Sequence, residues 1–157
     1  RPKNILEVGT FSGYSAICLA EGLAEGGKLY TFEINDEMED FTRPWIEGSS
    51  VADKIDFRIG DAPVEAPKLG IHFDLAFVDG DKRTYLETYE MVLSILNPGG
   101  YILADNTLWD GHVIDPAYDK DHQTQGIRKF NDFIAQDPRV EVVILPLRDG
   151  LTLIRKK

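Results

Sequence analysis

The stretch NILEVGTFSG, residues 4–13, has the pattern of a buried strand that leads directly into a glycine-containing turn. Three of its first five residues are apolar, as expected for a strand that is covered on both faces of a parallel sheet. The helical pattern that follows extends to Leu23. A strand, a turn with glycines at positions 9 and 13, and a helix together predict the opening unit of a nucleotide-binding α/β fold.

Strand and helix patterns alternate through the rest of the chain. Repeated strand–helix units with apolar strands predict a doubly wound, Rossmann-like α/β fold, in which helices cover both faces of a parallel sheet. The sequence RDG at 148–150 is typical of a hairpin turn, so we expect seven strands, mostly parallel, with an antiparallel strand at the edge. We expect a single domain, 1–157. The predicted strands are 4–8, 28–33, 55–59, 73–78, 101–104, 140–145 and 151–155, and the predicted helices are 14–23, 36–46, 64–69, 84–96 and 124–135.

Composition and charge narrow the class of protein. Of the 157 residues 43% are hydrophobic and 28% charged, which is typical of a globular domain, and no apolar run approaches the roughly 18 residues of a membrane span. The net charge of −10 would repel a phosphate backbone and disfavours nucleic acid as a partner. The only cysteine, Cys18, cannot form an internal disulfide, which favours a cytoplasmic location. Its apolar helical surroundings predict a buried, inert thiol.

Residues that follow the strands are the candidates for a site, because ligands of such sheets bind beyond the carboxyl ends of the strands. Every one of these segments contains a glycine, an acid or an amide, and turns alone do not require so many acids. They occupy positions 9–13, 33, 60–62, 79–82 and 105–106.

The first two strands carry the pattern of a nucleoside site. Glu33 lies 24 residues after Gly9, about where an acid binds ribose hydroxyls. Gly9 and Gly13 are spaced Gly-x-x-x-Gly, which differs from the dinucleotide motif Gly-x-Gly-x-x-Gly. The carboxylate of Glu7 should face the same crevice, where it would repel a pyrophosphate and attract an ammonium or a sulfonium. These features favour S-adenosylmethionine over NAD. The alternative is a tight turn followed by a solvated strand end.

The fourth and fifth strands carry the pattern of a metal site. Asp79 follows the fourth strand, and Asp105 and Asn106 follow the fifth. Two carboxylates and an amide without histidine or cysteine suit Mg²⁺, or a similar hard cation such as Mn²⁺ or Ca²⁺. In the alternative reading the two aspartates are only helix caps or turn formers.

Lys82, three residues after Asp79, is a candidate general base. A cation close to an ammonium lowers its pKa, which allows it to accept a proton. We therefore expect a vicinal diol to chelate the metal, Lys82 to remove a proton from one hydroxyl, and the oxygen to attack the methyl group of the sulfonium. Outside such a site Lys82 would be an ordinary surface charge.

Four motifs resemble the cation-dependent O-methyltransferases, the family that includes catechol and caffeoyl-coenzyme-A O-methyltransferases. The resemblance runs from Ile5 to the end of the chain, and it departs from the family pattern at Gly80, where alanine is usual. It implies the fold of class I methyltransferases. The motifs are EVGTFSGYS at 7–15, FVDGDK at 77–82, ADNTLWDG at 104–111, the most specific of the four, and LPLRDGL at 145–151.

The resemblance also implies roles for single residues. The metal ligands would be Asp79, Asp105 and Asn106, and Lys82 would be the base. In the cofactor site Ser15 would bind the methionine carboxylate, Glu33 the ribose, Ala62 the adenine and Asp81 the amino group. The implied cofactor contacts are Glu7, Gly9, Thr10, Ser15, Glu33, Ala62 and Asp81.

The resemblance also concerns assembly and substrate. It implies a catechol-like small-molecule substrate, a homodimer, and helices before the first strand that cover the cofactor and substrate. The chain opens at Arg1 without an initiator methionine and reaches the first strand within a few residues, so we expect sequence upstream to be missing.

Three other functions are compatible with parts of the sequence. A tRNA-modifying enzyme of the same fold would methylate a hydroxylated uridine, but the net charge of −10 disfavours it. A non-catalytic module that binds the cofactor has no need of Asp79, Lys82, Asp105 and Asn106 together. A NAD-dependent reductase is disfavoured by Glu7 and the glycine spacing.

Overall fold

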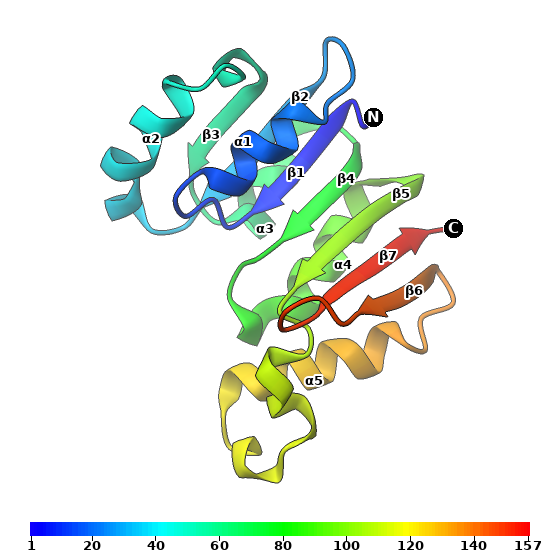
Figure 1. Ribbon diagram of the computed structural model, residues 1–157. Coiled ribbons are helices and arrows are strands. Elements are labelled where there is room, and N and C mark those ends of the chain that lie inside the picture. The colour runs from blue at the N-terminus through cyan, green and yellow to red at the C-terminus, as the bar shows by residue number, and fades with distance from the viewer.

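Seven strands form one sheet in the computed structural model, which describes residues 1–157 (Figure 1). The strands are β1 (Asn4–Val8), β2 (Lys28–Glu33), β3 (Ile55–Ile59), β4 (Phe73–Val78), β5 (Leu96–Asp105), β6 (Val140–Leu145) and β7 (Leu151–Lys156). The α-helices are α1 (Tyr14–Glu21), α2 (Glu39–Glu47), α3 (Ala62–Glu65), α4 (Tyr85–Ile95) and α5 (His122–Ile134). Short 3₁₀ helices are η1 (Asp36–Met38), η2 (Ala52–Lys54), η3 (Ala66–Leu69), η4 (Lys82–Thr84), η5 (Trp109–Ile114) and η6 (Pro116–Tyr118).

The strand order is β3-β2-β1-β4-β5-β7-β6, which confirms the predicted doubly wound, mostly parallel sheet. Neighbours from β3 to β5 are parallel. Strand β7 pairs antiparallel with both β5 and β6. The hairpin therefore supplies the predicted antiparallel strand, which lies one position in from the edge because β6 is outermost.

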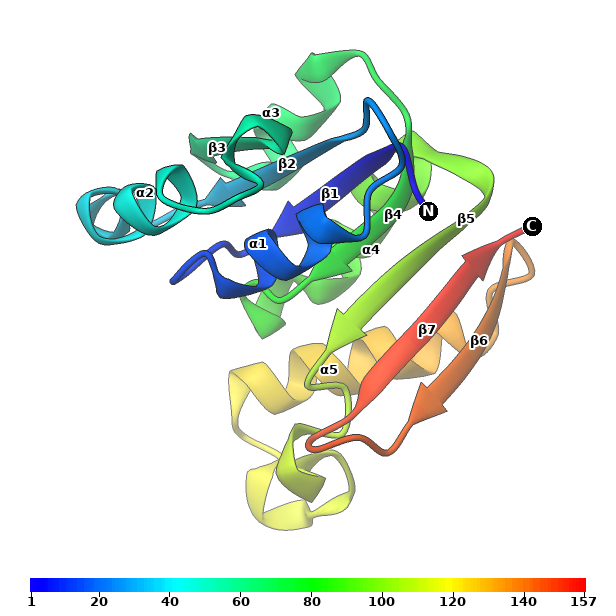
Figure 2. The same ribbon diagram turned by 45° about the horizontal axis from the view of Figure 1, so that its top comes forward.

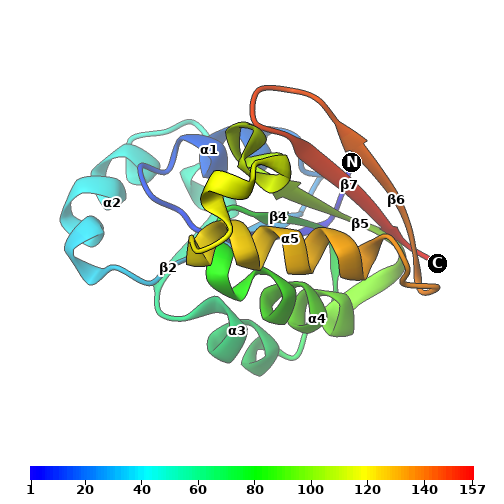
Figure 3. The ribbon, with the colours of Figure 1, turned by 90° about the horizontal axis from the view of Figure 1, so that it is seen from below.

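Helices cover both faces of the sheet (Figure 3). Helices α1 and α2 lie on one face, over β1 to β3, and α3, α4 and α5 lie on the other. Alternation along β1 assigns its side chains to these two layers: Ile5 packs in the cluster under α1 and α2, and Leu6 in the larger cluster under α4 and α5. Glu7 follows Ile5 by two residues and therefore faces the α1 side.

Some boundaries and one burial prediction differ from the structure. Strand β5 begins at Leu96, because the backbone before the glycines already pairs with Phe73. The prediction that Cys18 is buried is wrong: the thiol is exposed, because α1 turns Ala16 and Ala20 toward the sheet instead. None of the helices combines the length and the apolar composition needed to cross a membrane.

The topology brings six chain segments to one edge of the sheet. The carboxyl ends of β1 to β5 point to this edge, and β7 starts there because it runs in the opposite direction. The β6–β7 turn consequently lies beside the segment that follows β5 (Figure 2). Both chain termini lie at the opposite edge (Figures 1 and 2).

Candidate cofactor and metal site

A buried hydrogen-bonded chain joins the ends of β1 and β2. The hydroxyl of Thr31 donates to Oε2 of Glu7 at 2.5 Å, and the hydroxyls of Thr10 and Thr31 are 2.6 Å apart. Because Thr31 has a single hydroxyl proton, Thr10 is then the donor between the two. All three side chains are almost fully buried. Thr10 was predicted to bind a cofactor, but its hydroxyl already makes a hydrogen bond to Thr31 inside the protein.

The other carboxylate oxygen of Glu7 has no partner. Oε1 is buried and makes no hydrogen bond. Burial raises the pKa of Glu7 from 4.5 to about 7, and the nearby charges of Asp79 and Glu33 add to this effect, while the hydroxyls of Ser15 and Thr31 oppose it. A buried acceptor that lacks a donor costs free energy unless a ligand supplies one. The residue is therefore suited to a cationic ligand group.

Glu33 closes the turn between β1 and α1. Its two carboxylate oxygens accept the backbone N–H groups of Phe11 and Asn35, at 2.8 and 2.9 Å. Each oxygen keeps a further lone pair for a ligand hydroxyl. The acid is mostly buried, so the reading of Glu33 as a solvated strand end is wrong.

A pocket of about 600 Å³ opens at the ends of β1 to β4. Its walls include five of the predicted cofactor or metal residues, and Ala62 and Pro63 form one side at the start of α3. The predicted residues in its lining are Gly9, Glu33, Ala62, Asp79 and Asp81.

The packing of neighbouring segments explains why positions 9 and 13 are glycine, which was not evident from the sequence. Both have left-handed backbone, with φ of 98° and 80°. A Cβ at Gly9 would lie 2.5 Å from the carbonyl oxygen of Asp79, and one at Gly13 would lie 3.0 Å from Ile46. Glycine is thus required at position 9 by the approach of β4, in addition to any approach by a ligand.

Ser15 lies in the first turn of α1. The N-cap residue of this helix makes no side-chain hydrogen bond to the helix, so backbone N–H groups at the start of α1 remain free. Such a helix start favours an anionic group. The carboxylate of Asp81 was predicted to bind an amino group of the cofactor. In the structure it already accepts hydrogen bonds from the backbone N–H and the guanidinium of Arg83.

The side chain of Lys82 is buried at the end of β4. Its ammonium donates to Oδ1 of Asp79 at 2.8 Å and to the hydroxyl of Tyr85 at 3.0 Å. The Tyr85 hydroxyl in turn lies 2.9 Å from the carbonyl oxygen of Val78 and 2.7 Å from that of Asp105. Burial raises the pKa of Tyr85 well above its usual value, so it is neutral. Tyr85, which the sequence did not indicate, joins the two segments that carry the predicted metal ligands.

Asp105 lies beside Asp79, as predicted, and Asn106 is the next residue in the chain. Val78 and Ala104 are register partners in parallel strands, so the two aspartates follow directly at the same level. Burial raises the pKa of Asp105, and the charges of Asp79 and Asp149 contribute. Two carboxylates that repel each other at a partly buried position gain from a cation between them.

The donor set fits a hard cation only if the amide takes part. No three His, Cys, Asp or Glu side chains gather closely enough to hold a metal by themselves. The predicted set contains two carboxylates and the amide of Asn106, whose nitrogen donates to Asp149 at 2.8 Å and whose oxygen is left for another contact. Oxygen donors of this kind suit Mg²⁺. Asp149 was read from the sequence only as part of a turn.

Comparison with known proteins agrees with this geometry. A family model with the description O-methyltransferase matches residues 1–157. The chain belongs to the O-methyltransferase family. Caffeoyl-CoA O-methyltransferase 1 of Eucalyptus globulus is 39% identical to this O-methyltransferase over 98% of the chain and 67% of the relative. Caffeoyl-CoA O-methyltransferase of Petroselinum crispum is 38% identical over 98% and 68%. The chain thus spans about two thirds of the length of these relatives.

Solved structures of O-methyltransferases share the fold. An O-methyltransferase from Bacillus cereus, in complex with SAH, superposes with a TM-score of 0.91 at 34% identity and covers 99% of this chain and 74% of that one. The O-methyltransferase TomG from Streptomyces achromogenes, in complex with SAM, has a TM-score of 0.91 at 30% identity, with the same coverage. The predicted class I methyltransferase fold is confirmed.

Proposed function

We propose that this O-methyltransferase transfers the methyl group of S-adenosylmethionine to one hydroxyl of a metal-chelated vicinal diol, such as a catechol. The observation that carries the proposal is the position of Lys82. Its buried ammonium lies 2.8 Å from Asp79 and next to the segment of Asp105, so a base and the oxygen ligands of a hard cation share one corner of the site.

The cofactor residues match the chemical groups of S-adenosylmethionine. The unpaired Oε1 of Glu7 would accept from the ammonium, and the free N–H groups around Ser15 would bind the carboxylate. Glu33 would accept from the ribose hydroxyls, and Ala62 would contact the adenine from the pocket wall. Asp81 would reach the amino group only by sharing its carboxylate with Arg83.

Asp79, Asp105 and Asn106 would hold Mg²⁺, or Mn²⁺ or Ca²⁺ in its place. When bound, the cation supplies positive charge that lowers the pKa of a chelated hydroxyl. Tyr85 keeps the ends of β4 and β5 together by its contacts with Val78 and Asp105, so the ligands from the two strands stay in place.

In its neutral amine form, Lys82 would take the proton of the substrate hydroxyl at Nζ. The oxygen then forms a bond to the methyl carbon while the carbon–sulfur bond breaks and its electron pair returns to sulfur. The products are the methyl ether, S-adenosylhomocysteine and a proton on Lys82, which is released to solvent. The hydrogen bonds of Lys82 to Asp79 and to the buried Tyr85 keep its nitrogen at this place, so the entropic cost of orientation is met before the reaction.

We further propose that the protein is a homodimer, from the family resemblance, and that it is cytoplasmic, from its single cysteine. Light scattering after size exclusion would test the dimer. A tRNA substrate remains the second candidate within the same fold, although the net charge of −10 disfavours it.

Methyl transfer from labelled S-adenosylmethionine tests the function. The longest natural form of the protein would be assayed with caffeic acid and caffeoyl-CoA, with Mg²⁺, with EDTA, and as the Asp105→Ala variant. Transfer that requires the metal and disappears in the variant is expected. Tight cofactor binding without transfer to any catechol would favour a tRNA or another substrate, and absence of cofactor binding would overturn the proposal.

A further inference from the structure

The turn between β6 and β7 holds the segment that carries Asn106. The antiparallel register places Asp105 opposite Leu151, so the end of the turn lies directly against this segment (Figure 2). The backbone carbonyl of Asp149 accepts the N–H groups of Leu108 and Trp109, at 2.8 and 3.0 Å, and that of Gly150 accepts the N–H of Thr107, at 3.1 Å. Three consecutive backbone donors after Asn106 are thus bound by two residues of the turn.

The β6–β7 turn and the segment after Asn106 are too close together for a side chain to fit between their backbones at position 150. Gly150 has φ of 96°, and a Cβ at this position would lie 2.5 Å from the backbone nitrogen of Leu108. Any other residue would push the turn and the segment apart. The close contact therefore depends on glycine at position 150 and does not reflect loose surface packing.

The side chain of Asp149 contacts the amide of Asn106. Oδ2 of Asp149 accepts from Nδ2 of Asn106 at 2.8 Å, and Asn106 itself has left-handed backbone with φ of 59°. An amide can bind a metal ion only through its oxygen. A carboxylate on the nitrogen side allows one orientation of the amide, because a flipped amide would bring two oxygens together. It also makes the amide oxygen more negative.

We propose that Asp149 is a positioning residue of the metal site, which orients the amide of Asn106 so that its oxygen faces the cation. This inference rests on the proposed function. Asp149 does not contact the cation itself; it acts through the hydrogen bond to Asn106 and the backbone clamp on residues 107–109. Partners that orient a metal ligand in this way commonly change metal affinity about 10- to 100-fold.

Direct titration with Mn²⁺ tests the role. Free Mn²⁺ would be followed by electron paramagnetic resonance in the presence of S-adenosylhomocysteine, for the wild type and for Asp149→Ala, Asp149→Asn and Asp132→Ala. Asp132 is an exposed acid on α5 and serves as a charge-matched control. Melting temperatures in EDTA and the affinity for S-adenosylhomocysteine report whether each variant is folded.

The expected result is a Kd for Mn²⁺ that rises about 10- to 100-fold in Asp149→Ala and stays unchanged in Asp132→Ala. Asp149→Asn retains an acceptor oxygen without the charge and should lose about 3- to 10-fold. Unchanged affinity in both Asp149 variants overturns the inference but leaves the proposed function intact. Should Asp149→Ala not fold, wild-type affinity in Asp149→Asn overturns it equally. A wild type that binds no Mn²⁺ overturns the proposed function as well.

Discussion

The ammonium of Lys82 and the carboxylate of Asp79 form an ion pair of unequal exposure. The two groups are 2.8 Å apart, with 6% of the lysine side chain and 42% of the aspartate side chain exposed. The positive charge is thus held inside the protein, against the ring of Tyr85, while the carboxylate faces the pocket. Asp79 is therefore more accessible to a substrate or an ion than Lys82 is.

Replacement of Lys82 tests its role as the base. Lys82→Met keeps the apolar stem but removes the amine, and we expect kcat to fall about 10²- to 10⁴-fold, because this is the usual contribution of a general base. The affinity for S-adenosylmethionine, measured by calorimetry, should stay unchanged. The control Lys129→Met removes an exposed lysine that pairs with Glu87. Retention of full activity in Lys82→Met would refute the assignment.

The buried carboxyl of Glu7 predicts a pH dependence of stability. Its pKa is about 7 in the folded chain, against 4.5 when unfolded, so the folded state binds the proton more tightly. This contribution to stability is fully present below pH 4.5 and is lost as the pH rises through 7. Without cofactor, wild type should lose about 3 kcal/mol relative to Glu7→Gln between pH 4.5 and 8. Urea unfolding of both proteins across this range measures the difference, and parallel curves would contradict the prediction.

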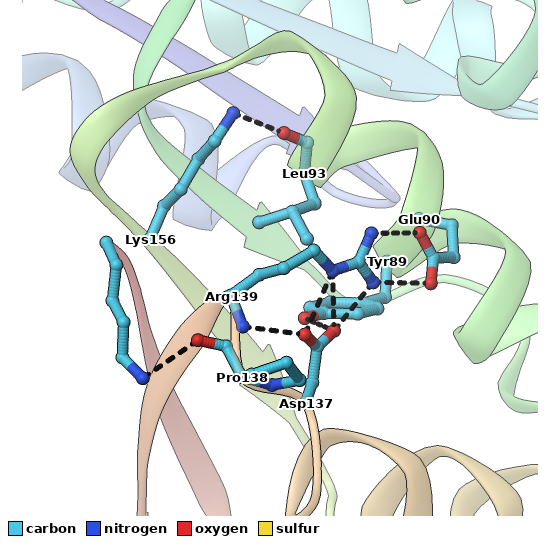
Figure 4. A network of polar contacts seen from close by, with 8 residues as sticks. Tyr89, Glu90, Leu93, Asp137, Pro138, Arg139 and Lys156 are labelled. Atoms are coloured by element: carbon cyan, nitrogen blue, oxygen red, sulfur yellow. Dashed lines mark hydrogen bonds and ion pairs between the residues drawn. The ribbon is translucent and has the colours of Figure 1, made fainter.

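A polar network just after the C-terminal end of α5 is expected to stabilise the folded chain at neutral pH. Figure 4 shows the guanidinium of Arg139 between the carboxylates of Asp137 and Glu90. Asp137 also accepts from the hydroxyl of Tyr89 at 2.8 Å. The hydrogen bonds from Arg139 lower the pKa of Asp137 from 3.8 to about 2, despite its burial.

The contribution of Asp137 is present above pH 3.8 and is lost as the pH falls to 2. We expect Asp137→Asn to lower the free energy of unfolding by about 2 kcal/mol at pH 7, and by less near pH 2. Chemical denaturation at the two pH values measures this. Asp132→Asn, which changes an exposed acid on α5, should have little effect. Equal effects of the two variants would count against the network.

Gly126 marks the closest approach of α5 to the turn that carries Lys82. A Cβ at this position would lie 2.2 Å from the carbonyl oxygen of Lys82 and 2.9 Å from the Cα of Arg83. Gly126→Ala must therefore displace the backbone of η4, and we expect about 1 to 3 kcal/mol of destabilisation, as for overpacking elsewhere. It should also lower methyl transfer by moving Lys82. Thermal unfolding and the transfer assay measure both effects, with Gln123→Ala, an exposed change in the same helix, as the control. If the Gly126→Ala variant is as stable and active as the wild type, the backbone of η4 can shift without cost and the prediction is wrong.

Much of the fold was predictable because buried parallel strands have a distinctive pattern. Their apolar runs and the glycines and acids at their ends located the strands, and the adjacency of β4 and β5 was enough to bring Asp79 next to Asp105. Tyr85 and Asp149 were not predictable as site residues. Tyr85 acts through carbonyl groups, which every residue has, and Asp149 contacts Asn106 across 43 residues of sequence.

Cys18 shows that a local sequence pattern does not determine which side of a helix is buried. An apolar stretch predicts burial, but which side of a short helix faces the sheet depends on the packing of its neighbours, and in α1 the small side chains of Ala16 and Ala20 occupy that side.

The amino-acid sequence was sufficient to specify which chemical groups stand at the ends of the strands, because strand pattern and turn chemistry are local. Burial and hydrogen-bond partners depend on contacts between distant segments, and these decide how the groups behave. Removal from water raises the pKa of Glu7 and leaves one of its oxygens unpaired, the ring and hydroxyl of Tyr85 enclose Lys82, and the β6–β7 turn orients Asn106. Desolvation and orientation are properties of the packed chain, so they become visible only in three dimensions.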